Sequence, residues 1–218
     1  MKRTISFMTG KGSVNHNSRK FHAKNTDPER SYLNVEYCNE NVKDVYHELF
    51  DEALERYNAK QIRSDRKIKD YYEKIRSSKQ EKPFHEIILQ VGGKGNMNAD
   101  TENGDLAKQV LNEYYQGFQE RNPQLRVFSA HLHMDEATPH LHIDFVPFTT
   151  GSKRGLDTRV SLKQALATQG FKGGSRGDTE WSQWIQSEKE QLAAVMERYG
   201  IEREHKGTYE KHLSVLDY

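Results

Sequence analysis

The chain has 218 residues, and 33 Lys and Arg against 32 Asp and Glu leave a formal net charge of only +1. This balance excludes a uniformly basic nucleic-acid binder, so any DNA-binding surface must be local. Hydrophobic residues make up 34% of the chain, enough for one packed core. No apolar run approaches the roughly 18 residues of a membrane span, the amino terminus lacks a signal peptide, and the single cysteine, Cys38, excludes an internal disulfide. We therefore expect a cytoplasmic protein.

The amino-terminal third is predicted to contain a strand, a long loop and helical segments. Residues 4–8 alternate between apolar and polar side chains, which predicts a short strand. Residues 10–39 are polar and interrupted by Gly, Asn and Pro, which is typical of loops. Apolar side chains then recur at helical spacing over residues 42–57 and again over residues 68–75. This pattern indicates either one long helix or two helices in sequence.

The middle of the chain is predicted to contain three strands and a helix. Residues 84–91 are predicted to form a strand that ends at two glycines. Residues 106–118 carry a helical apolar stripe that stops before a proline. Two further strands, over residues 127–134 and 140–146, are joined by a short connection, which indicates an antiparallel hairpin.

The two faces of this hairpin differ in chemistry, because side chains alternate between the faces of a strand. One face is expected to pack on helices and carries Phe128, Ala130, Leu132, Met134, Leu141, Ile143 and Phe145. The other face carries Ser129, His131, His133, His140, His142 and Asp144.

The carboxy-terminal part is predicted to be helical. Ser161 and Gln164 fit a capping box at the start of a short helix, and a longer helix follows Asp178 and stops at Gly200. Residues 201–218 are ambiguous. Because no linker separates domains, we expect residues 1–218 to form one α+β domain.

Three histidines of the hairpin are candidate metal ligands. His140 and His142 are two residues apart on one strand and point the same way, and His133 lies within cross-strand reach. Three converging neutral imidazoles make an open metal site, for which Mn, Zn, Fe, Co or Ni is better suited than Mg. The alternative is a solvated polar face of the sheet. The acidic residues that could orient a ligating ring are Asp135, Glu136 and Asp144.

Basic residues gather in two parts of the chain. The first 24 residues contain no Asp or Glu but carry Lys2, Arg3, Lys11, Arg19, Lys20 and Lys24. A glycine-rich loop after the hairpin adds Lys153 and Arg154. If these segments gather around the hairpin, they form a groove for a polyanion. The alternative is a solvated run of charge.

Two motifs resemble those of a known family. Residues 131–147, HLHMDEATPHLHIDFVP, strongly resemble the third motif of MobV-type relaxases, the plasmid mobilisation and recombination (Pre/Mob) family. Residues 16–19, HNSR, and residues 27–34, DPERSYLN, resemble the first motif of that family. The motifs occur in the family's order, and the resemblance spans most of the chain.

The resemblance implies a fold and an activity. The fold is the HUH endonuclease architecture, an antiparallel five-stranded sheet with flanking helices. The activity is site- and strand-specific nicking and rejoining of DNA at a plasmid transfer origin, single-stranded or in a hairpin near the nick. It also implies a divalent metal, Mn²⁺ or Mg²⁺, held by His133, His140 and His142. Such a relaxase domain is compatible with the amino-terminal part of a longer protein.

The resemblance also implies residue roles. In this family a histidine of the first motif can replace the tyrosine nucleophile of other relaxases, and the matching residue is His16. A covalent 5′-phosphoryl-histidine intermediate follows from that role. Glu136 matches a motif acid and is expected to act in catalysis. Val35 stands where the family often has Tyr, and Tyr32 and Tyr37 nearby are alternative nucleophiles.

The expected DNA contacts are Arg19, Lys20, Arg30, Lys153 and Arg154. Two other functions fit parts of the sequence. A metal-dependent hydrolase of small molecules would use the histidines but leaves the basic segments and His16 without a role. A DNA-binding module with a structural metal would bind DNA without nicking it.

Overall fold

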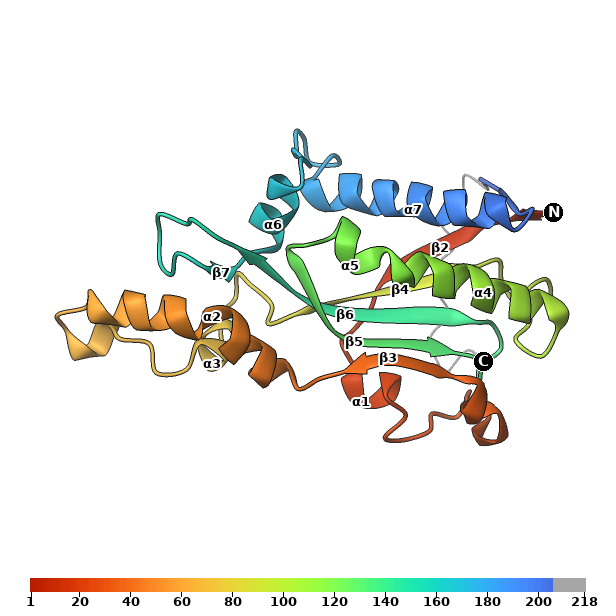
Figure 1. Ribbon diagram of the computed structural model, residues 1–218, viewed down its shortest axis with the longest axis horizontal. Helices are drawn as coiled ribbons and strands as arrows, with labels where there is room; N and C mark the ends of the chain where they lie inside the picture. The colour runs from red at the N-terminus through yellow and green to blue at the C-terminus, as the bar shows by residue number, and fades with distance from the viewer. Residues whose placement is uncertain (206–218) are drawn as a thin grey trace.

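The computed structural model describes residues 1–205, and its central feature is an antiparallel sheet (Figure 1). Neighbouring strands follow the order β2 (Ile5–Thr9), β4 (His85–Val91), β6 (His140–Thr149), β5 (Leu125–His133) and β3 (Val35–Asn39). The short β7 (Arg159–Val160) pairs with β6, and a separate parallel pair joins β1 (Lys2–Arg3) to β8 (Glu202–Arg203). The predicted α+β class with a five-stranded antiparallel sheet is confirmed.

Helices cover one face of the sheet, and other segments lie against the opposite face. The covering layer consists of α4 (Glu102–Gln116), α5 (Phe118–Arg121), α6 (Leu162–Thr168) and α7 (Glu180–Arg198), which lie on the same side in Figure 1. The short α1 (Val14–Asn17) lies on the other side, whereas α2 (Val42–Ala59) and α3 (Tyr71–Arg76) extend away from the sheet. Short 3₁₀ helices occur at η1 (Pro28–Leu33) and η2 (Ser64–Arg66).

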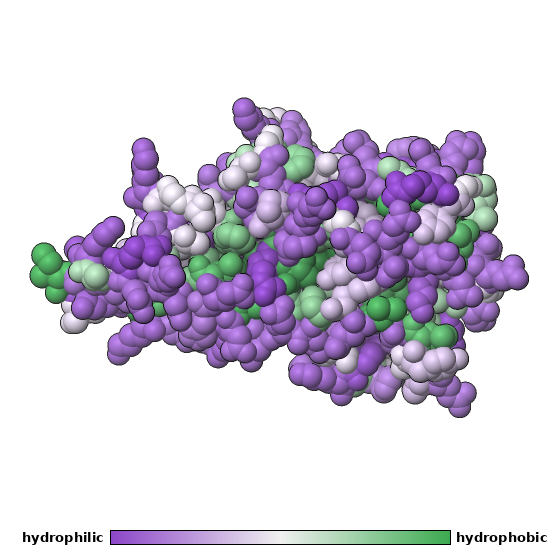
Figure 2. Space-filling model, in the orientation of Figure 1, coloured by the Kyte–Doolittle hydropathy of each residue, from purple (hydrophilic) through white to green (hydrophobic). Residues whose placement is uncertain are grey.

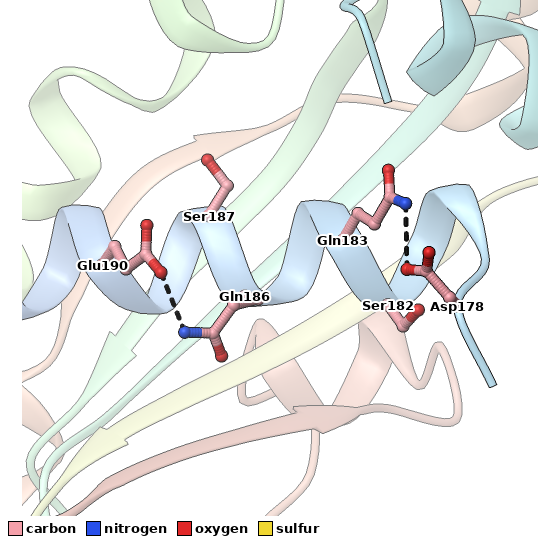
Figure 3. Close-up of a pocket in the computed structure, with 6 residues that line it drawn as sticks. All are labelled: Asp178, Ser182, Gln183, Gln186, Ser187 and Glu190. Carbon is pink, nitrogen blue, oxygen red and sulfur yellow. Dashed lines mark hydrogen bonds between the residues drawn. The ribbon is translucent and has the colours of Figure 1, made fainter. Parts of the chain in front are cut away.

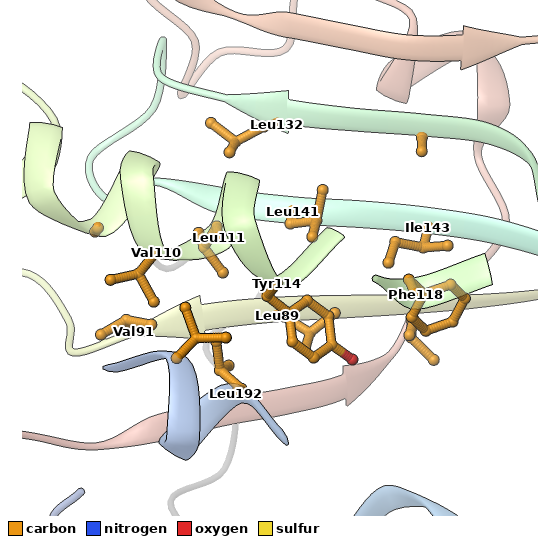
Figure 4. Close-up of a cluster of buried hydrophobic side chains, with 14 of the residues drawn as sticks. Leu89, Val91, Val110, Leu111, Tyr114, Phe118, Leu132, Leu141, Ile143 and Leu192 are labelled. Atoms are coloured by element: carbon orange, nitrogen blue, oxygen red, sulfur yellow. The ribbon is translucent and has the colours of Figure 1, made fainter. Parts of the chain in front are cut away.

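The main core lies between the sheet and the helical layer. Strands β5 and β6 contribute Leu132, Leu141 and Ile143, all without exposed surface. They pack in one cluster with side chains of β4, α4, α5 and α7 (Figure 4). The labelled members from these elements are Leu89, Val91, Val110, Leu111, Tyr114, Phe118 and Leu192. The apolar face predicted for the hairpin is therefore the face that packs on helices.

A second hydrophobic cluster occupies one end of the opposite face of the hairpin. Phe128 and Val146 pack there with side chains of α2 and α3, at the end of the strands away from the histidines. We predicted that Phe128 shares a face with Ala130, and this is wrong. The register of β5 against β6 shifts between Val127 and Ser129, and the extra residue of this bulge reverses the alternation.

Residues 10–39 are more ordered than predicted. Strand β3, α1 and η1 all fall in the range that we expected to be mainly loop. The apolar pattern from residue 42 corresponds to two helices, α2 and α3, rather than one. Each begins at a capping side chain, since Asn41 accepts a hydrogen bond from the Lys43 N–H and Asp70 accepts one from the Glu73 N–H, both at 2.9 Å.

The carboxy-terminal helices begin near the predicted residues. Ser161 Oγ accepts a hydrogen bond from the Gln164 N–H at 3.3 Å at the start of α6, but the Ser161 N–H donates to the Pro147 carbonyl, so the reciprocal half of the predicted capping box is not formed. Gly200, with φ of 70°, follows the end of α7. Of the ambiguous residues 201–218, those from 206 onward lie outside the described residues. None of the helices within residues 1–205 is long and apolar enough to cross a bilayer, and the face in Figure 2 is mostly hydrophilic.

Leu141 offers a test of the core, because its two neighbours on β6 are histidines of the opposite face. Leu141→Ala should lower the free energy of unfolding by about 2–5 kcal/mol, since it leaves a cavity in a fully buried cluster. Urea denaturation measures this change as a shift in midpoint at constant slope. Ile62→Ala is the control, since Ile62 is fully exposed and its truncation should change stability by less than about 0.5 kcal/mol. Equal losses in the two variants would contradict the core described here.

Candidate active site

The register of the β5–β6 hairpin brings three histidines together. His133 lies opposite His140 across the strands, and His142 follows two residues later on the same face. The ring centroids are 4.7 Å apart for His133 and His142, 5.0 Å for His140 and His142, and 5.2 Å for His133 and His140. One nitrogen of each ring lies within 4.8 Å of the others, as three ligands of a single ion require. His131, also on this face, is not part of the group.

In each of the three rings, one nitrogen contacts a protein oxygen outside the histidine group, and the other nitrogen faces the other two rings. His133 Nε2 lies 2.8 Å from the Asn17 carbonyl oxygen, and His140 Nδ1 lies 2.8 Å from the Thr138 carbonyl oxygen. His142 Nδ1 lies 2.6 Å from Glu86 Oε1. These oxygens only accept, so in a neutral ring they favour the tautomer with the proton on the nitrogen that faces them and the lone pair on the other nitrogen. The lone-pair nitrogens of His133 and His140 lie 3.3 Å apart. His142 Nε2 is buried and has no hydrogen-bond partner within residues 1–205. This donor set fits a divalent metal.

The charge state of the rings agrees with that arrangement. Burial lowers the pKa of His133, and the neighbouring His140 and His142 lower it further. Burial also lowers the pKa of His142, with added repulsion from His140 and His16. Without a metal, both rings therefore stay neutral near pH 7 and keep their lone pairs.

His16 lies beside this group, on α1. Its ring centroid is 6.1 Å from that of His133 and 6.3 Å from that of His142. Its Nε2 is 3.3 Å from Arg19 Nη1, which can only donate, and 3.8 Å from Glu136 Oε1. Burial lowers the pKa of His16, and Arg19 lowers it further while Glu136 opposes the shift. The lowered pKa favours the neutral imidazole, and the contact with Arg19 Nη1 favours the tautomer in which Nε2 is unprotonated.

The position of α1 depends on Asn17. The helix has only four residues and would not be stable alone. The Asn17 side chain is 1% exposed and donates to Glu86 Oε1 at 2.8 Å and to Asp144 Oδ2 at 3.0 Å. Its carbonyl accepts the bond from His133. These contacts fix the residue next to His16 against both β4 and the hairpin.

Arg19 connects the first motif to the turn of the hairpin. Its guanidinium donates to Asp135 at 2.9 and 2.6 Å and to Glu136 Oε1 at 2.8 Å, with 10% of the side chain exposed. Asp135 also accepts hydrogen bonds from Ser31 and Asn34, both at 2.8 Å. Burial opposes ionisation of Asp135, but the bonds from Arg19, Asn34 and Ser31 hold its pKa below the usual range. Arg19, which was predicted as a DNA contact, therefore lies inside the site and pairs there with two carboxylates.

Glu86 is a site residue that the sequence analysis missed. It is buried on β4, and its Oε2 accepts a hydrogen bond from the Gly12 N–H at 2.6 Å. The Gly10 N–H donates to the Glu86 carbonyl at 2.9 Å, and a Cβ on Gly10 would lie 2.0 Å from Glu86 Oε2. Beside it, burial and the Glu86 charge raise the pKa of Asp144 to about 7. The available signal was a single acidic residue inside the predicted strand 84–91.

The other predicted DNA contacts are dispersed. Lys20 is exposed directly after α1 and Arg19, whereas Arg30 donates to the Met134 carbonyl and fixes the start of the hairpin turn. Lys153 and Arg154 follow the far end of β6. Seven residues of strand separate His142 from that end, about 23 Å. The structure does not bring this loop to the histidines, and DNA contacts by Lys153 and Arg154 stay predictions.

The two alternative nucleophiles occupy different environments. Tyr37 packs with the main core on the opposite face, stacks on Tyr115 at 4.1 Å, and has its pKa raised to about 12 by burial. Tyr32 is exposed on η1. A third aromatic residue, Phe21, is 51% exposed, and its ring centroid is 5.8 Å from that of His16. Sequence reasoning passed over Phe21 because one aromatic in a polar loop carries no periodic pattern.

A hollow of about 320 Å³ along α7 offers no comparable chemistry. It is lined by the polar residues Asp178, Ser182, Gln183, Gln186, Ser187 and Glu190. Two pairs already bond to each other, Gln183 with Asp178 and Gln186 with Glu190, both at 2.9 Å (Figure 3). Helix α7 belongs to the layer that covers the face opposite the histidines.

Known proteins resemble this chain in sequence and fold. Plasmid recombination enzyme type 1 of Staphylococcus aureus is 25% identical over 188 residues, which cover 84% of this chain and 44% of that protein. The chain thus spans less than half of that relative.

Crystal structures of the MobM relaxase domain (MOBV; Mob_Pre), bound to oriT DNA of plasmid pMV158 and to Mn, share the fold. One at pH 5.5 has 21% identity and a TM-score of 0.53, covering 100% of this chain and 97% of that chain. Another at pH 4.6 has 22% identity and a TM-score of 0.51, covering 100% and 98%.

The model of one protein family provides the assignment. That family, described as plasmid recombination enzyme (Mob_Pre), matches residues 36–218. The match contains the whole histidine hairpin and Glu86, whereas His16 and Arg19 precede it. Because it covers well over half of the sequence, this chain belongs to the plasmid recombination enzyme family.

Proposed function

We propose that residues 1–218 form a relaxase domain that nicks and rejoins one strand of DNA at a plasmid transfer origin, with His16 as the nucleophile. The observation that carries this proposal is the position of His16. Its ring centroid lies 6.1 Å from that of His133 and 6.3 Å from that of His142. The family assignment and the DNA-bound MobM structures support the substrate.

His133, His140 and His142 would hold a divalent cation. Mn²⁺ suits imidazole ligands better than Mg²⁺, which prefers oxygen, and the MobM structures are Mn-bound. When bound, the cation supplies Lewis-acid stabilisation of the negative charge on the scissile phosphate. The protein contributes the tautomers and ring directions that leave three lone pairs for it.

The bond-breaking step is a transfer of the phosphoryl group to His16. The Nε2 lone pair forms a bond to phosphorus, and the bond to the 3′ oxygen breaks. That oxygen leaves with the electron pair and takes a proton from water, while the imidazole releases its Nδ1 proton. The product is a 5′-phosphoramidate on His16. The linkage retains the energy of the broken bond, so attack by the 3′-hydroxyl restores the strand without ATP.

Arg19 and Glu136 position the nucleophile. Arg19 donates to His16 Nε2 and so keeps this nitrogen free of a proton. The contact is long, at 3.3 Å, and the same guanidinium can turn to a phosphate oxygen when DNA enters. Glu136 Oε1 fixes Arg19 at 2.8 Å and lies 3.7 Å from His140 Nε2, between the nucleophile and the ligands.

The test of the nucleophile is His16→Ala. We expect this variant to lose nicking and the covalent protein–DNA species but to retain DNA binding, because the ring is small and partly exposed. Incubation with labelled origin DNA and Mn²⁺, followed by peptide mapping of the attached residue, measures the outcome. Tyr32→Phe is the control and should keep full activity. A covalent species that persists in His16→Ala and disappears in Tyr32→Phe would transfer the role to Tyr32. Binding without any adduct in the wild type would identify a DNA-binding module.

The metal centre can be tested without DNA. We expect Mn²⁺ binding to weaken in each of the variants His133→Ala, His140→Ala and His142→Ala. The loss should exceed about 10- to 100-fold, which is typical when a residue that only hydrogen-bonds to a ligand is removed. Isothermal titration calorimetry measures the affinity, and chelation should stop nicking until Mn²⁺ is restored. His131→Ala is the matched control, because His131 is buried on the same face outside the group. Unchanged affinity in all three variants would remove the metal centre.

Phe21 and Lys20 allow a test of the path that the single-stranded DNA takes beside His16. An exposed ring beside the nucleophile can stack on the base next to the scissile phosphate, and Lys20 can contact the backbone. Phe21→Ala should weaken binding of single-stranded origin DNA by about 5- to 150-fold, the usual value of one base stack, whereas Phe21→Trp should preserve it. Fluorescence anisotropy measures both, with Ile62→Ala as the control. Equal binding by Phe21→Ala and the control would exclude this path.

A further inference from the structure

Glu86 has an environment that the proposed chemistry does not yet use. Its side chain is almost completely buried, and both carboxylate oxygens accept hydrogen bonds. Oε1 accepts from His142 Nδ1 at 2.6 Å and from Asn17 Nδ2 at 2.8 Å, and Oε2 accepts from the Gly12 N–H at 2.6 Å. One carboxylate thus contacts a candidate ligand, the helix of the nucleophile and the glycine loop.

We propose that Glu86 is a positioning residue that holds His142 as the Nδ1–H tautomer and links the nucleophile's helix to the metal centre. The inference rests on the proposed function. A carboxylate bonded to the back of a ligating imidazole fixes the direction of the ring and makes its other nitrogen more basic. For His142 that other nitrogen is the buried Nε2, which has no hydrogen-bond partner among the described residues.

Asn17 extends the link to a second ligand. Its amide spans Glu86 and Asp144, while its carbonyl accepts from His133 Nε2. The residue that follows His16 therefore contacts one candidate ligand directly and a second through Glu86. Loss of either contact would let the four-residue α1 move relative to the histidines.

The glycine loop is shaped to receive this carboxylate. A Cβ on Gly10 would overlap Glu86 Oε2. A Cβ on Gly12 would lie 2.7 Å from the Phe84 ring, and the φ of 74° at Gly12 is a backbone conformation that other residues rarely adopt. Glycine at both positions lets the backbone close over Glu86 and donate to it. The Gly10-Lys11-Gly12 segment therefore contributes two backbone N–H groups that hold Glu86 in place.

Glu86→Gln and Glu188→Gln form a matched pair for the test. Glu188 of α7 is also a buried carboxylate, and it accepts from Tyr114 at 2.6 Å and from Asn122 at 3.0 Å, within the helical layer. Each substitution keeps the size of the side chain but removes one accepting oxygen. Glu86→Gln should lower Mn²⁺ affinity by about 10- to 100-fold, whereas Glu188→Gln should leave it unchanged.

Electron paramagnetic resonance of Mn²⁺ bound to the whole chain, without DNA, gives both affinities, and thermal unfolding gives the stability of each variant. Wild-type affinity in Glu86→Gln would overturn the inference and leave the metal centre intact. Absence of Mn²⁺ binding by the wild-type protein would overturn the metal centre and, with it, this inference.

A second measurement covers the case in which Glu86→Gln does not fold. Long-range ¹H–¹⁵N spectra of the metal-free wild-type protein report which nitrogen of each histidine carries the proton. His142 should be protonated at Nδ1 and free at Nε2. Protonation at Nε2 in the folded protein would overturn the inference, because the Glu86 contact would then not govern the ring.

Discussion

The antiparallel pairing of His133 with His140 is the constraint on which the candidate active site depends. It places three imidazoles on one face at the turn end of the hairpin. A slip of one residue would turn all of them toward the core, because the side-chain period of a strand is two. The opposite face prevents this slip, since Leu132 and Leu141 are fully buried against the helical layer. The precision of the polar site therefore comes from apolar packing on the other side of the same strands.

Much of this arrangement was accessible from the sequence, because it depends on local alternation. Two short strands and a tight connection predict which side chains share a face, and the structure brings His133, His140 and His142 together as that argument requires. The argument failed at Phe128, because a bulge changes the alternation without a recognisable pattern in the residues around it. It also passed over β3, whose five residues lie in a segment rich in loop formers.

The hydrogen-bond partners of the histidines could not be predicted from the sequence in the same way. Glu86 reaches His142 because β4 lies next to β6, a pairing between strands that are about fifty residues apart in the chain. Asn17 reaches His133 through a helix too short to have an apolar stripe. Such contacts are set by the order of strands in the sheet and by where a loop crosses it, neither of which spacing reveals.

The carboxylates on the two sides of the site have different partners. Asp135 and Glu136 share the guanidinium of Arg19, which offsets one of their two negative charges. Glu86 and Asp144 instead share the neutral amide of Asn17. Glu86 contacts no Lys or Arg among the described residues, and its negative charge lies behind His142 in a buried region where electrostatic interactions are strong. A divalent cation on the inner nitrogens would balance it through the imidazole, while Arg19 remains near His16 for the phosphate. One pair of carboxylates thus lies at the turn beside Arg19 and the other lies behind His142, and each pair connects the nucleophile's segment to the histidines.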